Sequence, residues 1–182
     1  MVVNKHGSFY LRSGWGTKII YAVKEDDTIF SPNNEQAAVD NIGLGRVMIK
    51  ALRYWSDALG LTEEEKKPAG ISKKKTALFD LIDEHDRYYQ RIGSLLLMHR
   101  NLARNRDDAT AWYWAFNELK NQSFTKEDFV DGFHAFLGVN GVNVKKGAIE
   151  KEFNCFKNTY IGDDKFDRKT IMDEDTYPFL AP

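Results

Sequence analysis

The stretch "IGLGRVMIKALRYWSDALGL", residues 42–61, constrains the fold more than any other part of the chain. Two glycines one residue apart precede a run with helical periodicity, in which the apolar residues share one side of a helical wheel. They are Met48, Ala51, Leu52, Trp55 and Leu59. The cations Arg46, Lys50 and Arg53 fall on the other side. A helix with so distinct an apolar face needs other elements to cover that face.

The rest of the chain also favours helices. Only four prolines occur in 182 residues, two of them in the last few positions, and apolar residues recur at helical spacing. The sequence therefore predicts a mainly α protein. The expected helices span about 14–24, 33–41, 46–59, 72–83, 93–104, a segment starting near 107, 126–137 and a last helix that carries 149–160. In the helix at 93–104 we expect Leu95, Leu96, His99 and Leu102 to face the core.

Turn and cap residues mark where these elements begin and end. Asn33 or Asn34 is expected to cap the second helix, Ser72 the fourth, and Gly60 to end the third. The sequence "TKED", beginning at Thr125, has the pattern of a capping box. Pro68-Ala69-Gly70 is typical of a turn, and it can close a short β-hairpin.

These elements suggest two units. Residues 1–84 are expected to form a winged-helix-like unit, a helix-turn-helix plus a short hairpin wing, and residues 85–182 an α-helical unit with an acidic tail from Ile161 onward. One continuous domain is the alternative.

The glycine pair at Gly43 and Gly45 has two interpretations. A dinucleotide-binding loop needs a third glycine where Met48 stands, and a strand before the loop where "NEQAAVDN" instead favours a helix. Helix, glycine-containing turn and helix is instead the order of a helix-turn-helix motif. We therefore interpret the second helix of this pair as a candidate recognition helix.

The expected DNA contacts are the basic residues of this helix and of the hairpin. They are Arg46, Lys50 and Arg53 on the helix, and Lys66, Lys67, Lys73, Lys74 and Lys75 on the wing. The chain as a whole has a formal net charge of −1, but between residues 42 and 76 the cations exceed the carboxylates by four. A solvated face of an ordinary amphipathic helix would look similar, and surface lysines are the simpler interpretation of the hairpin.

No catalytic motif, metal site or cofactor-binding motif is found, so the catalytic residues stay unknown and no cofactor is expected. The single cysteine, Cys155, excludes an internal disulfide and is expected to be buried. "DEHD" at 83–86 is best interpreted as a helix end, with a divalent-metal site as the alternative. "WYWAF" at 112–116 is interpreted as core, with a base-stacking platform as the alternative. No apolar stretch is long enough for a signal peptide or a membrane span, which favours a soluble cytoplasmic protein without membrane contacts.

Three stretches together resemble a bacterial domain-of-unknown-function family, family 4007, which accompanies DNA phosphorothioation genes and includes SspB-like proteins. They are "HGSFYLRSGWGTK", "IGLGRVMIKALRYWSDALGL", and "ATAWYWAFNEL" with "FNCFKNTY" downstream. The first contains the family's spaced residues as His6, Phe9, Arg12, Gly14, Trp15 and Lys18. The second departs from the pattern, because Leu44 replaces a valine and Arg46-Val47 replaces Lys-Asn. Family members usually continue well beyond "YPFLAP", so we expect either an N-terminal piece or a short relative.

The resemblance implies a DNA-associated protein that acts with a phosphorothioation-linked modification or phage defence system. Its partners would be DNA and other proteins of that system. A member of the family is described as a DNA-nicking protein, so a metal-dependent nickase is an alternative, although no catalytic residue can be transferred. A helical adaptor that docks a partner ATPase or sulfur-transfer protein is the third possibility.

Overall fold

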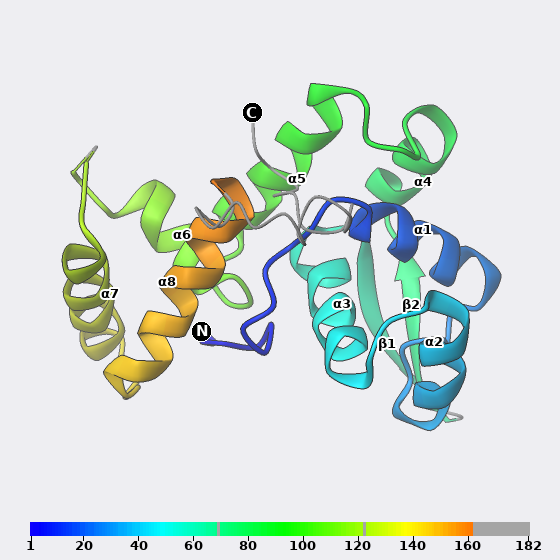
Figure 1. Ribbon diagram of the computed structural model, residues 1–182, viewed down its shortest axis with the longest axis horizontal. Helices are drawn as coiled ribbons and strands as arrows, with labels where there is room; N and C mark the ends of the chain where they lie inside the picture. The colour runs from blue at the N-terminus through cyan, green and yellow to red at the C-terminus, as the bar shows by residue number, and fades with distance from the viewer. Residues whose placement is uncertain (69, 122, 162–182) are drawn as a thin grey trace, which may run out of the picture.

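The computed structural model describes residues 1–68, 70–121 and 123–161, and within them the chain is mainly helical, as predicted (Figure 1). Eight α-helices, a short 3-10 helix and two strands are found in this part of the chain. In order they are α1 Trp15–Glu25, η1 Pro32–Asn34, α2 Glu35–Ile42, α3 Arg46–Ala58, β1 Thr62–Lys67, β2 Gly70–Lys75, α4 Ala77–His85, α5 Ile92–Arg104, α6 Thr110–Asn117, α7 Lys126–Val139 and α8 Lys146–Tyr160. None of these helices has the length and apolar character needed to cross a bilayer.

The elements gather in two groups along the long axis of the molecule. Helices α1 to α4 and the hairpin lie on one side, and α6 to α8 lie on the other (Figure 1). The N-terminal segment passes between α3 and α8: the indole NH of Trp55 donates to the carbonyl oxygen of Phe9 at 3.0 Å, and the His6 ring lies 3.1 Å from Glu152. This segment therefore connects the two groups.

Helix α3 buries the face that the sequence assigned to it. Leu52 and Trp55 are fully buried, whereas Val47 on the opposite side is exposed. The helix ends where Gly60 adopts φ +72°, and the Gly60 NH donates to the carbonyl oxygen of Asp57. The predicted C-terminal glycine is therefore confirmed, because this left-handed conformation strains any residue with a Cβ.

The predicted hairpin is also confirmed. Strands β1 and β2 are antiparallel, with Thr62 opposite Lys75 and Lys67 opposite Gly70, so the turn lies between Lys67 and Gly70. Gly70 has φ +131°, and a Cβ there would lie 2.9 Å from the Ser31 hydroxyl. The tip thus packs against the segment before η1, which explains why glycine ends the turn.

Aromatic side chains form the core of the second group. Trp112, Phe129 and Phe133 are fully buried, and Trp114 lies against both phenylalanines with ring centroids 5.1 and 5.3 Å apart. Most of the "WYWAF" segment is therefore core, as expected, although Phe116 is partly exposed. The capping box before α7 is confirmed, because the Thr125 hydroxyl accepts from the Asp128 NH and the Asp128 carboxylate accepts from the Thr125 NH.

Three local predictions were wrong. Ser72 does not cap a helix but is buried within β2, and Thr76 caps α4 by accepting from the NH of Phe79. Asn34 makes no cap, because its side-chain amide donates to the Thr28 carbonyl and hydroxyl oxygens instead. In α5 Leu102 is buried and Leu95 packs against the core, as predicted, but Leu96 is 57% exposed. Ser94 and Met98 face inward instead.

The buried residues form one cluster that includes members of both groups. Trp55 of α3 meets Trp112 of α6 edge to face, with ring centroids 5.3 Å apart. Cys155 on α8 is buried in this cluster, as predicted. A division near residue 84 stays a prediction, and all but the first residue of the acidic tail from Ile161 lies outside the described residues.

Candidate nucleic-acid interface

The turn between α2 and α3 sets the position of the candidate recognition helix. Gly43 adopts φ +72°, Leu44 is buried, and Gly45 leads into α3 with an ordinary φ of −63°. The ammonium group of Lys18 on α1 donates to the carbonyl oxygen of Ile42, at the end of α2, over 3.2 Å. The turn is therefore fixed on three sides, by the left-handed Gly43, by the buried Leu44 and by α1.

Arg46 and Lys50 project from the first turns of α3, with side chains 66% and 72% exposed. Both face Glu35 at the start of α2: the Lys50 ammonium lies 3.1 Å from its carboxylate and the Arg46 guanidinium 4.0 Å. Arg46 also donates to the side chain of Gln36. A ligand anion would therefore compete with Glu35 for these two cations, but exposed pairs of this kind hold only about 0–1 kcal/mol.

Arg53 is more enclosed. Its guanidinium donates twice to the Glu64 carboxylate of β1, at 2.6 and 3.1 Å, and its side chain is only 29% exposed. Burial raises the Glu64 pKa, but the hydrogen bonds and charges of Arg53 and Lys73 outweigh it, so that the pKa is lowered overall. Arg53 therefore links α3 to the hairpin as well as facing solvent.

Lys73 has to be removed from the predicted contact residues. Its side chain is fully buried, and its ammonium group pairs with Asp57 of α3 and, at 3.4 Å, with Glu64 of β1. Burial raises the Asp57 pKa, and Lys73 opposes that rise. Because the lysine is enclosed by these carboxylates, it holds β2 against α3 and presents no charge to a ligand.

The other hairpin lysines lie on the surface. Lys67 at the tip pairs with Asp27 at 3.2 Å and with Glu65 at 3.6 Å, and Lys75 lies over the ring of Phe79. Lys66 and Lys74 are exposed and have no ion pair within the described part of the chain. Glu63 stands opposite Lys74 in the register, so the middle of the hairpin is of mixed charge and its tip is basic.

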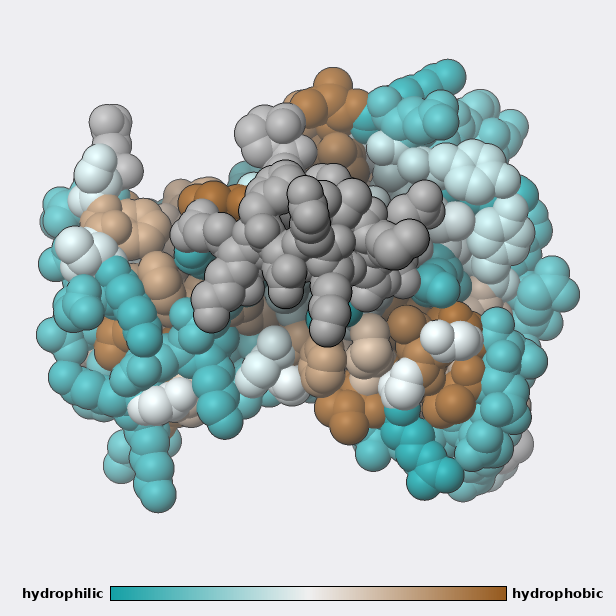
Figure 2. All heavy atoms as spheres, viewed as in Figure 1, coloured by the Kyte–Doolittle hydropathy of each residue, from teal (hydrophilic) through white to brown (hydrophobic). Residues whose placement is uncertain are grey.

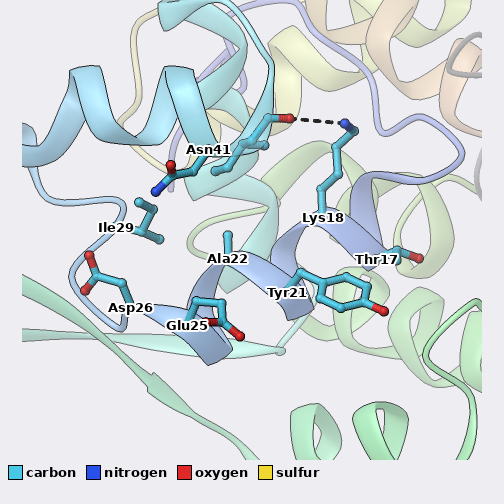
Figure 3. Close-up of a pocket in the computed structure, with 9 residues that line it drawn as sticks. Thr17, Lys18, Tyr21, Ala22, Glu25, Asp26, Ile29 and Asn41 are labelled. Atoms are coloured by element: carbon cyan, nitrogen blue, oxygen red, sulfur yellow. Dashed lines mark hydrogen bonds between the residues drawn. The ribbon is translucent and has the colours of Figure 1, made fainter.

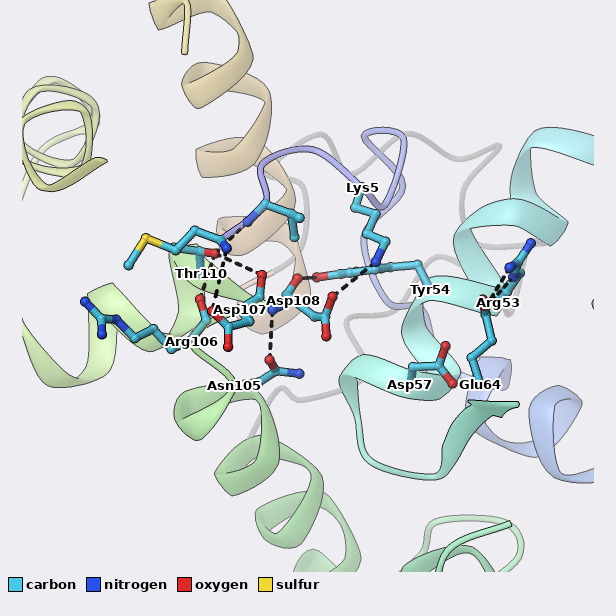
Figure 4. A network of polar contacts seen from close by, with 12 residues as sticks. Lys5, Arg53, Tyr54, Asp57, Glu64, Asn105, Arg106, Asp107, Asp108 and Thr110 are labelled. Atoms are coloured by element: carbon cyan, nitrogen blue, oxygen red, sulfur yellow. Dashed lines mark hydrogen bonds and ion pairs between the residues drawn. The ribbon is translucent and has the colours of Figure 1, made fainter. Parts of the chain in front are cut away.

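A polar groove of about 560 Å³ runs along the side of α3, between the two groups of elements (Figure 4). Lys50, Arg53, Asp57 and Glu64 line one wall. The other wall has the Lys5–Asp108 ion pair, 3.1 Å long, and the Asp108 carbonyl accepts from the Tyr54 hydroxyl. The groove thus presents both charges, most of them already paired.

No group of three or more metal-ligating side chains comes together among residues 1–68, 70–121 and 123–161. The "DEHD" segment ends α4, as expected: Asp83 pairs with Lys24 and Arg87, and Asp86 accepts from the Ser94 hydroxyl. These carboxylates stabilise the α4–α5 connection.

The His6–Glu152 pair was missed by sequence reasoning. Both side chains are buried, the imidazole and carboxylate are 3.1 Å apart, and Glu152 also accepts from the Asn4 NH. The two residues are too far apart in sequence for any local pattern to pair them, and His6 was notable only within the family-like motif "HGSFYLRSGWGTK". Within that motif Trp15 is buried and the Arg12 guanidinium lies 5.1 Å from the Tyr10 ring centroid, so both side chains contribute to packing.

Fold and site together define a mainly helical protein in which helix, glycine turn and helix are followed directly by an antiparallel hairpin. The family model of DUF4007, described as a protein of unknown function, matches residues 3–181, so the chain belongs to this family.

Two solved structures resemble the chain. One is a crystal structure of magnesium-ion-bound SspB, with a TM-score of 0.79 and 25% sequence identity, and the other a crystal structure of SspB, with a TM-score of 0.78 and 26% identity. Each alignment covers 97% of this chain and 54% of the SspB chain, so the chain spans about half the length of those proteins. No curated protein matches.

Proposed function

We propose that this chain is a DNA-binding component of a phosphorothioation-linked bacterial modification or defence system, in which α3 enters the major groove and the hairpin acts as a wing. The observation that carries the proposal is the start of α3, where Arg46 and Lys50 stand exposed opposite the buried Leu52 and Trp55. Recognition helices place their N-terminal residues against base edges while their other face packs on the core. The likeness to SspB and the family resemblance supply the phosphorothioation context.

The wing lysines would contact phosphate. Lys66 and Lys74 are exposed without ion pairs in the described part of the chain, and Lys67 and Lys75 lie near them in the hairpin register. Lysines bind phosphate through charge and carry little sequence information. Base contacts are therefore assigned to α3 and phosphate contacts to the hairpin, with Arg53 at the boundary between them.

The test is duplex binding measured by fluorescence anisotropy over a range of salt concentrations, on plain and phosphorothioated DNA. The double variant Arg46→Ala/Lys50→Ala should fold normally and lose most of the affinity. Each lost phosphate contact should also reduce the slope of log affinity against log salt by about 0.9. Lys66→Ala/Lys74→Ala should change the slope and leave sequence preference unchanged.

Helices α7 and α8 provide the matched control. Lys126 pairs with Glu150 at 3.0 Å and Lys146 with Asp131 at 2.7 Å, so both are exposed cations paired with one carboxylate, as Lys50 is. Lys126→Ala/Lys146→Ala removes the same charge from the other group of elements and should leave binding unchanged. Equal losses in the two double variants would indicate attraction by overall charge and would contradict a role for α3.

A helical adaptor is the second candidate, favoured by the outer face of α5. Ile92, Leu96 and Leu97 are exposed there, and the space-filling view shows apolar atoms over this helix (Figure 2). If the parent chain binds no duplex at low salt, the adaptor becomes the leading function. A magnesium-dependent nickase is the third candidate. The described residues bring no group of three or more metal-ligating side chains together, so we derive no catalytic step.

A further inference from the structure

A second concave site lies between α1 and α2, away from the exposed cations of α3 (Figure 3). It encloses about 450 Å³, within the range of about 300–1,000 Å³ that is usual for small-molecule pockets. We propose that this hollow binds a nucleobase, a neutral planar heterocycle that carries both hydrogen-bond donors and acceptors. The proposal goes beyond duplex binding by α3 and does not depend on it.

The floor of the hollow is apolar. Ile29 and Ile42 are buried, and the methyl group of Ala22 points up between the two helices (Figure 3). A larger side chain at position 22 would fill this space, so the hollow exists because alanine stands there. A flat apolar surface of this kind suits the face of an aromatic heterocycle.

Tyr21 supplies an aromatic wall. Its side chain is 42% exposed, and its hydroxyl lies 3.2 Å from the Tyr88 hydroxyl. The Arg87 guanidinium lies 5.4 Å from the ring centroid, so the ring is held in place. Positioned aromatic rings are the usual stacking partners of unpaired bases.

Two polar groups at the rim are available for recognition. The Asn41 amide and the Glu25 carboxylate have no hydrogen-bond or ion-pair partner within the described residues, whereas the neighbouring Asp26 accepts from Thr28. An amide presents a donor and an acceptor side by side, which matches a base edge, and a carboxylate accepts from an exocyclic amino group. The two come from different helices.

The charge of the lining argues against a bound phosphate. Lys18 is the only cation among the lining residues, and its ammonium group is bound to the Ile42 carbonyl oxygen, while Glu25 and Asp26 are acidic. A nucleotide would therefore insert its base and leave its phosphates in solvent. The chemistry admits two sources, a free nucleoside and an unpaired base of a nucleic acid.

The first experiment titrates the full chain with the four common nucleosides and their triphosphates and follows backbone amide chemical shifts by NMR. Saturable shifts are expected around Ala22 and Asn41, with nucleoside and triphosphate of similar affinity. Ala22→Phe should weaken binding at least about tenfold, as a filled pocket does. Asn41→Ala should also weaken it, and Asn154→Ala, an exposed asparagine on α8, should not.

Three outcomes of this titration would contradict a nucleobase site. Absence of shifts near Ala22, a triphosphate that binds much more tightly through α3, or the same shifts from a simple alkylamine would overturn the proposal. If Ala22→Phe does not fold, the Asn41→Ala and Asn154→Ala comparison decides. The source of the base is identified by comparing a duplex that has one unpaired base with a fully paired duplex. If the unpaired base raises affinity in the parent chain and not in Ala22→Phe, the source is a nucleic acid. If nucleosides bind but the two duplexes bind equally, the source is a free ligand, and both outcomes support the nucleobase site.

Discussion

The two groups of elements differ in the contacts that link the helices and strands within each group. Around α1, α2, α3 and the hairpin, directed polar contacts fix the elements: Lys18 to the end of α2, Lys73 to Asp57, and Arg53 to Glu64. Helices α6 to α8 pack through aromatic rings, with Phe129 against Trp114, Phe153 and Phe156. The ion pairs between α7 and α8, Lys126–Glu150 and Lys146–Asp131, lie on the surface. Hydrogen bonds and ion pairs join particular atoms at short distances, whereas ring pairs bury large apolar areas. The polar contacts of the first group thus fix the orientation of α3 and the hairpin, which carry the candidate interface.

The largest expected effect comes from truncating one buried ring in each group. Trp55→Ala and Phe129→Ala should each lower the free energy of unfolding by about 3–5 kcal/mol, because both side chains are fully buried. Urea unfolding followed by circular dichroism and by fluorescence measures this loss. If residues 1–84 and 85–182 are separate domains, each variant lowers its own transition, whereas one shared transition supports a continuous domain.

Lys73→Met should have the next largest effect. It leaves Asp57 and Glu64 without the buried cation between them, and a loss of about 2 kcal/mol is expected, less than for a fully buried pair because Asp57 is partly exposed. Lys74→Met is the control, because it removes the same charge from an exposed position. Denaturant titration of both variants therefore separates the effect of the buried ion pair from the effect of losing one positive charge. Similar stabilities for the two variants would show that the polar contact does not hold β2 to α3.

The two glycines of the α2–α3 turn should differ despite their shared sequence context. Gly43→Ala puts a Cβ at φ +72° and should cost about 1–2 kcal/mol. Gly45 has an ordinary φ, and a Cβ there would meet no atom within 4 Å, so Gly45→Ala should change stability by less than about 0.5 kcal/mol. Thermal melts of both variants test this, and a larger loss at Gly45 would mean that the turn has another conformation.

The smallest effect concerns His99 of α5, whose ring contacts Tyr160 of α8 in the second group. Burial lowers the His99 pKa below 6.5, so the folded protein disfavours the protonated ring while the unfolded chain accepts a proton. The contribution of His99 to the free energy of unfolding is therefore fully present above pH 6.5. It is lost as the pH falls through 6.5 toward the lower pKa of the folded state. His99→Gln should reduce the pH-dependent part of the free energy of unfolding by less than about 1 kcal/mol. Thermal melts between about pH 5 and about pH 7.5 measure this change. An unchanged pH profile would indicate that other groups cause it.

Local patterns in the sequence determined the elements of this protein. Apolar periodicity located α3 and its buried Leu52 and Trp55, Gly60 marked the end of that helix, and the turn after Lys67 predicted the hairpin. The orientation of the cations on α3 followed from the same wheel. These features depend on residues that are a few positions apart, and a sequence pattern reports interactions between such close neighbours.

Only the tertiary structure decided which cations stay accessible. Lys73 and Lys74 are neighbours in one basic run, yet Lys73 is buried and Lys74 is exposed, because Asp57 of α3 and Glu64 of β1 enclose the first. Glu35 next to Lys50, His6 next to Glu152 and the hollow above Ala22 likewise arise where separate elements meet. The sequence thus determined where the helices and the hairpin lie and which face of α3 is apolar, and packing determined which cations remain free, because burial and charge pairing depend on neighbours that are distant along the chain.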